Sequence, residues 1–187
     1  MSTLKNTLTW SLAWLAAVGV AFALAFASPN EASVMGRMPP FMAQTLNRQP
    51  LAVPDGLAAE RTLALINFRK GQRPDIESWV QGLGLQRDTG IAWLRMPVLK
   101  DPGTASGRNA VETKLLAHYQ VPAERARLVP VFTDTDSFMR SAGLTRSDRV
   151  YAVVINRHGD ILARVEGEYD ADKADALRET LLQTDSF

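Results

Sequence analysis

From Arg61 onward, short apolar runs typical of β-strands alternate with amphipathic stretches typical of α-helices. Strands are predicted at residues 62–68, 91–99, 128–132, 150–155 and 161–165, and helices begin near residues 74, 110, 134 and 170. Such alternation implies parallel strands joined by right-handed crossovers, whereas the tight turn at residues 158–160 predicts a final antiparallel hairpin. We therefore expect an α/β fold, with a mixed central sheet and helices on both faces.

Local signals mark the ends of several of these elements. Pro74 suits the first turn of a helix, and Gly84 is suited to close that helix. Asp134 or Thr135 can cap the short helix that follows the third strand. Residues 101–107 are expected to form a loop. Trp79 and Trp93 lie on apolar faces, which favours core positions over an exposed recognition patch.

The N-terminus carries a long apolar segment, residues 8–27, which contains no charged residue. The small residues Ala25 and Ala27 before Ser28 fit a signal-peptide cleavage site. The segment is also long enough, as an apolar helix, to cross a bilayer. Residues 1–27 are thus interpreted as either a signal peptide or a membrane anchor. Both interpretations place the rest of the chain in the periplasm or another extracytoplasmic space, either soluble after cleavage or tethered to the inner membrane.

Residues 28–60 are expected to form a proline-rich connector, because five prolines interrupt any long helix there. Within this connector, residues 46–53 suit a short entry hairpin with Asn47 and Arg48 at the turn. The folded domain is then expected over residues 61–187.

The amino-acid composition excludes several classes of reaction and of metal site before any motif is considered. The 187-residue chain contains no Cys and two His, and its formal net charge is +1. The absence of Cys excludes disulfides, thiol catalysis, iron–sulfur clusters and the usual structural zinc sites. The near-neutral charge makes nucleic acid an unexpected partner. We expect no cofactor, no metal site and no catalytic residues, and hence a protein that is not an enzyme, with an unfamiliar cysteine-free enzyme as the alternative that stays open.

The order of elements resembles the thioredoxin-like fold. Residues 150–167 look like the closing hairpin of that fold, and residues 46–54 resemble the short entry hairpin of its redoxin-type members. A closer resemblance is to the assembly factors of the mitochondrial ATP synthase and their bacterial relatives. It is carried by short segments: Phe68-Arg69, Gln72, Trp79, Arg95-Met96-Pro97, Val131–Asp134 and Phe138.

This resemblance implies where a catalytic group would lie in the sequence. Thioredoxin-like enzymes hold a reactive Cys at the start of the helix after the first core strand, which here falls within Phe68–Pro74. They also place a cis-proline before the strand that leads into the closing hairpin, but residues 145–149 contain no proline. The resemblance therefore implies a redox-inactive protein-binding module of the cell envelope, acting as a chaperone or assembly factor with a protein partner, either soluble or embedded in a membrane.

Candidate binding residues cluster at the start of the first core helix and at the end of the following strand. They are Arg69, Lys70, Gln72, Arg73 and Arg95. Positive side chains near a helix N-terminus favour a carboxylate or phosphate. One hypothesis is a protein-contact surface, and another is a small-anion or small-molecule site. A solvated loop with no binding role stays open as well. Structural or solvated roles are favoured for His118 and His158, and Pro97 suits a sheet edge or a strand end.

Overall fold

A five-stranded mixed sheet forms the centre of the part of the chain that the computed structural model describes, residues 35–183. Its strand order is β5-β4-β3-β6-β7, with β3 parallel to β4, β4 parallel to β5, and β6 antiparallel to both β3 and β7. The strands are β3 (Arg61–Asn67), β4 (Trp93–Lys100), β5 (Val131–Thr133), β6 (Tyr151–Asn156) and β7 (Ile161–Glu166). The expected mixed sheet is confirmed.

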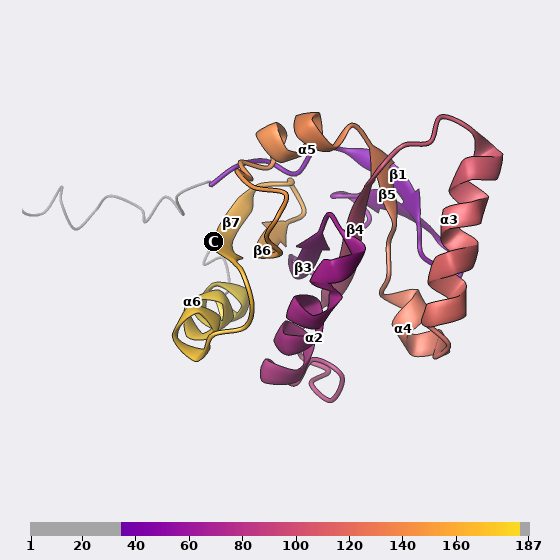
Figure 1. Ribbon diagram of the computed structural model, residues 1–187. Helices are drawn as coiled ribbons and strands as arrows, with labels where there is room; N and C mark the ends of the chain where they lie inside the picture. The colour runs from indigo at the N-terminus through magenta and orange to yellow at the C-terminus, as the bar shows by residue number, and fades with distance from the viewer. Residues whose placement is uncertain (1–34, 184–187) are drawn as a thin grey trace, which may run out of the picture. The chain divides into compact units, whose positions relative to one another are not determined.

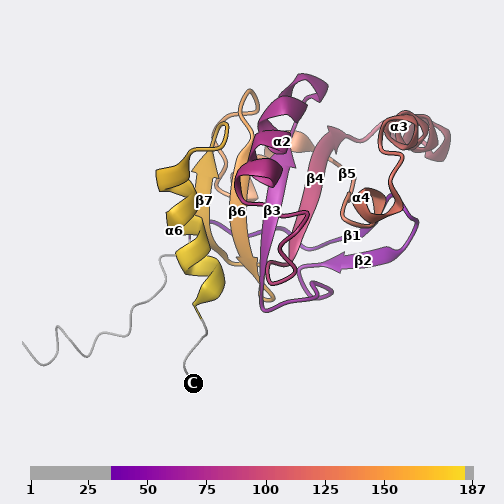
Figure 2. The same ribbon diagram turned by 90° about the horizontal axis from the view of Figure 1, so that it is seen from below.

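Helices cover both faces of this sheet, also as expected. The α-helices are α2 (Arg73–Gly82), α3 (Ala105–His118), α4 (Pro122–Ala126), α5 (Thr135–Ser141) and α6 (Ala171–Leu182), and the 3₁₀ helix η1 (Lys70–Gln72) precedes α2. In Figure 1, α5 lies on one side of the sheet and α2 and α6 lie on the other. Figure 2 shows α3 and α4 beyond the β5 edge.

Side chains along each strand point alternately to the two faces of the sheet, so the hydrophobic core has two parts. Leu63 and Leu65 of β3 pack with α2 and α6, whereas Ala64 and Ile66 pack on the side of α5. Successive side chains of a strand point to opposite faces, so one fully buried strand supplies both cores. The predicted core positions of Trp79 and Trp93 are confirmed, because these side chains are 0% and 4% exposed.

The predicted helix boundaries follow from capping chemistry. Pro74 lies in the first turn of α2, and Gly84, with a φ of 64°, closes the end of that helix. The backbone N–H of Ser137 donates to the carboxylate of Asp134 over 2.7 Å, so Asp134 is the N-cap of α5.

The N-terminal part of the described chain packs onto the domain. An antiparallel hairpin pairs β1 (Phe41–Gln44) with β2 (Pro50–Val53), so its first strand lies upstream of the predicted residues 46–53. Met38, Val53 and Leu57 are buried in the core on the α5 side. The predicted apolar helix of residues 8–27 lies outside the described residues. Between residues 35 and 183, no helix combines the length and apolarity that crossing a bilayer requires.

Some predicted boundaries were wrong. The loop expected at 101–107 ends early, because Thr104 accepts a hydrogen bond from the N–H of Gly107 and starts α3 at Ala105. Helix α4 was not predicted. Pro97 lies within β4, an interior strand, rather than at a sheet edge. An isolated bridge joins Arg95 to Leu128, and the pairing of β4 with β5 resumes only at Val98 and Val131, so this ladder is interrupted at Pro97, which has no N–H to donate.

Two glycines that end helices allow a matched test of packing. Gly143 and Gly84 have φ values of 65° and 64°, but only at Gly143 would a Cβ meet backbone, at 2.5 Å from the carbonyl oxygen of Met35. We expect Gly84→Ala to lower the free energy of unfolding by about 1–2 kcal/mol, the cost of left-handed backbone. Gly143→Ala is expected to cost about 1–3 kcal/mol more through overpacking. Urea unfolding of both variants measures the difference, and equal losses would contradict the close approach of residue 35.

Candidate functional site

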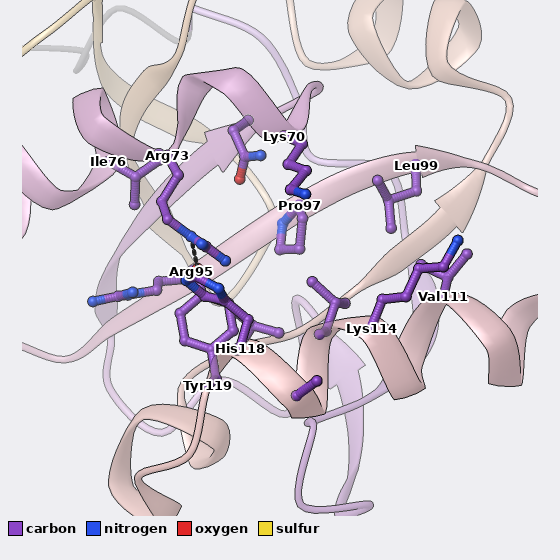
Figure 3. Close-up of a pocket in the computed structure, with 14 residues that line it drawn as sticks. Lys70, Arg73, Ile76, Arg95, Pro97, Leu99, Val111, Lys114, His118 and Tyr119 are labelled. Carbon is purple, nitrogen blue, oxygen red and sulfur yellow. Dashed lines mark hydrogen bonds between the residues drawn. The ribbon is translucent and has the colours of Figure 1, made fainter.

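A cavity of about 440 Å³ opens where β3 and β4 end, between the start of α2 and one face of α3. Asn67 ends β3, and Pro97 and Leu99 of β4 line the cavity beside it. Figure 3 shows the two other sides, with Lys70 and Arg73 on the side of α2 and Lys114 and His118 on α3. Such strand ends are where ligands commonly bind in α/β sheets.

The lining of this cavity is apolar with a positive rim. Its residues are Asn67, Lys70, Arg73, Ile76, Arg95, Pro97, Leu99, Val111, Lys114, Leu115, Ala117, His118, Tyr119 and Leu128. This set contains no Asp or Glu. In the described part of the chain, the ion pairs found do not include Lys70, Arg73 or Lys114. Within residues 35–183, these three positive charges therefore have no carboxylate in contact.

Arginine and aromatic side chains stack along one wall. The guanidinium of Arg95 lies 5.4 Å from the ring centre of Tyr119 and 5.6 Å from that of Trp93. Arg73 lies 4.9 Å from the same Tyr119 ring, and its Nε donates to the tyrosine hydroxyl over 3.3 Å. Arg127 lies 4.9 Å from the ring of Trp93. Each desolvated contact of this kind contributes about 0.5–2 kcal/mol, so the stack orients Arg73 at the cavity.

Arg95 is the buried centre of this stack. Its side chain is 2% exposed, and its two terminal nitrogens donate to both carboxylate oxygens of Glu77 over 2.5 and 3.1 Å. The bidentate pair neutralises a charge that would be costly to bury alone. Its Nε has no hydrogen-bond partner within the described residues.

Gln72 closes the loop between β3 and α2. Its side-chain oxygen accepts hydrogen bonds from the backbone N–H groups of Phe68 and Arg69, and its amide nitrogen donates to the carbonyl of Ser147 over 2.9 Å. The side chain is 7% exposed. Gln72 therefore uses its polar atoms inside the protein and holds two loops together.

Positive charges near the imidazole of His118 affect its pKa. Partial desolvation, followed by the charges of Arg73 and Lys70, lowers the pKa of His118 from its usual value. Glu77 and Glu124 oppose this effect. The ring also contacts Tyr119, with ring centres 5.3 Å apart. The lowered pKa favours the neutral form of this imidazole.

The structure brings together only some of the predicted binding residues. Lys70, Arg73 and Arg95 line the cavity, although Arg95 is buried and paired. Arg69 is exposed and reaches Ser147 Oγ at 3.4 Å, outside the lining, and Gln72 is structural. Tyr119, Lys114 and His118 also line the cavity, and the sequence analysis did not select them as binding residues. The spacing of Val111, Lys114, Leu115 and His118, on one helical face, carried that information.

Comparison with known proteins identifies the fold. No protein-family model matches the chain, and no curated protein matches it in sequence. BsSco, a member of the Sco family of cytochrome c oxidase assembly proteins, matches with a TM-score of 0.52 and 12% identity over 77% of this chain and 91% of that chain. The exposed lipoprotein thioredoxin Etrx1 from Streptococcus pneumoniae strain TIGR4 matches with a TM-score of 0.50 and 10% identity over 76% and 98% of the two chains. The fold is thioredoxin-like.

The ion pair beneath the cavity is open to a direct test. We expect Glu77→Gln to lower the free energy of unfolding by roughly 2–4 kcal/mol, because it leaves Arg95 buried without a countercharge. The control is Asp148→Asn, which removes the exposed pair with Arg146 and is expected to cost less than about 1 kcal/mol. Urea unfolding measures both variants. Similar losses would show that burial of Arg95 does not depend on Glu77.

Proposed function

We propose that the protein is a redox-inactive, thioredoxin-like binding module that acts outside the cytoplasm and contacts a protein partner. The observation that carries this proposal is the position of Gln72. It lies in the segment where the family resemblance places a reactive sulfur, and its amide is hydrogen-bonded into the fold at both ends. A chain without Cys has no thiol to exchange there.

The partner surface in this proposal is the loop after β3 together with the mouth of the cavity. Arg69 and Lys70 are exposed on that loop, and Arg73 follows at the start of α2. Positive side chains around an apolar hollow favour a partner segment that carries acidic residues beside apolar ones. Complementarity of shape and charge replaces covalent chemistry as the means of recognition.

The proposed cellular role is assistance to the assembly or maturation of a membrane complex, as a chaperone or assembly factor. BsSco, which shares the fold, belongs to a family of cytochrome c oxidase assembly proteins. Etrx1, which also shares it, is an exposed lipoprotein. The apolar residues 8–27 support the same extracytoplasmic placement, as either a signal peptide or an anchor. These observations support a membrane-associated partner.

Charge reversal tests this proposal. The tagged full-length chain is cross-linked mildly in cells, and its partners are captured from membranes. We expect a reproducible membrane-protein partner whose recovery falls by about tenfold or more with Arg69→Glu and Lys70→Glu combined, because like charges then repel an acidic segment.

The matched control is Lys173→Glu on α6, an exposed lysine that does not line the cavity. This variant is expected to retain the partner at the level of the unmodified chain. Recovery of the same proteins with all three chains, or of no reproducible partner, would contradict the proposed surface.

A further inference from the structure

The cavity between α2 and α3 has the size and lining of a small-molecule site. Its volume of about 440 Å³ falls in the range of roughly 300–1,000 Å³ that ligand pockets occupy. The lining is mostly apolar, and its polar groups converge from two sides in Figure 3. A protein partner that only covers the mouth would leave this volume unfilled.

The charges around the cavity select for an anion. Lys70, Arg73 and Lys114 line it, no acidic side chain does, and the described ion pairs use none of the three cations. A single negative charge placed among them would gain Coulomb energy in a partly desolvated site. A dianion would gain more attraction but would lose far more hydration against the apolar walls.

Helix α3 gives a second, independent observation. This 14-residue helix buries none of its side chains fully. Val111 and Leu115 are half-buried apolar residues on its inner face, and they line the cavity. Leu115 packs against the buried Tyr119 and Leu128, whereas Val111 belongs to none of the described core clusters. An apolar ligand body lying between Val111, Pro97 and Leu99 would supply a contact for this side chain.

We propose that this cavity binds a small amphiphilic monocarboxylate, with its apolar body against Pro97, Leu99 and Val111 and its carboxylate among Lys70, Arg73 and Lys114. This site goes beyond the proposed partner surface, and it does not require a protein partner. Arg73 is held in place by its contacts with Tyr119, so its guanidinium presents donors without much loss of side-chain entropy.

Binding in this cavity is coupled to the protonation of His118. The groups that face this imidazole are Lys70, Arg73 and Glu77 from the α2 side, Glu124 of α4 and the neighbouring Tyr119 ring. A carboxylate bound beside the cations offsets their repulsion of the imidazolium, so it raises the pKa of His118. By linkage, affinity rises as the pH falls through the titration range of His118.

The test uses the purified full-length chain in lipid nanodiscs, with empty nanodiscs subtracted, and titration calorimetry. The probe is 4-phenylbutyrate, compared with 4-phenylbutanol, which lacks the charge, with acetate, which lacks the apolar body, and with inorganic phosphate. We expect phenylbutyrate to bind at least about tenfold more tightly than each of the other three.

Variants locate the binding. Lys114→Gln changes an exposed residue on α3 and is expected to weaken phenylbutyrate binding by about five- to tenfold, whereas Lys173→Gln on α6 leaves it unchanged. Val111→Glu places a carboxylate inside the cavity and is expected to abolish binding. In parallel, NMR titration of the His118 ring is expected to show a higher pKa with the probe bound.

Several results would overturn the inference. They are equal affinity for phenylbutanol and phenylbutyrate, tighter binding of phosphate, or the same affinity in Lys114→Gln as in Lys173→Gln. Each would show that the cavity does not select an apolar monocarboxylate. Loss of a protein partner in the capture experiment leaves these outcomes unaffected, so the two proposals fail separately.

Discussion

The buried guanidinium of Arg95 holds together the end of the domain where the cavity lies. It lies on β4, is neutralised by Glu77 of α2 and stacks on both Trp93 and Tyr119, so it joins the sheet, α2 and the segment after α3. A buried charge tolerates few arrangements, because every departure leaves it unpaired at low dielectric. The same network orients Arg73, and thereby one rim of the cavity.

The fold is thioredoxin-like, and Gln72 lies in the segment where the sequence resemblance implies a reactive group. The side-chain amide of Gln72 is hydrogen-bonded to Phe68, Arg69 and Ser147, so it joins two loops. Beside this junction lies the cavity, along the inner face of α3, a helix without a fully buried residue. Among the described residues, cations without a carboxylate in contact and half-buried apolar side chains lie together at this cavity, a combination that is typical of ligand sites.

Part of the site was predictable because helix geometry is local. The start of α2 with Lys70 and Arg73 follows from Pro74 and the apolar stripe after it. Lys114 and His118 share a face with Val111 and Leu115, so their common direction was present in the spacing. The spacing did not show that this face of α3 meets Arg73. The loop before α3 and helix α4 after it carry no sequence pattern that indicates where α3 lies relative to β4. Gln72 was among the predicted binding residues. The sequence does not show whether a side-chain amide is free or already hydrogen-bonded to a distant carbonyl.

By itself, the sequence determined the mixed sheet, the helices on both faces, an N-cap at Asp134 or Thr135, the helix end at Gly84, and the absence of thiol chemistry. These depend on periodicity, on capping groups within a few residues, and on composition. Only the tertiary structure decided that the hairpin starts at Phe41, that Pro97 lies inside the sheet, and that Arg95 is buried against Glu77. These outcomes depend on which segments meet across the chain, and pairing energies between distant residues leave no local pattern to read.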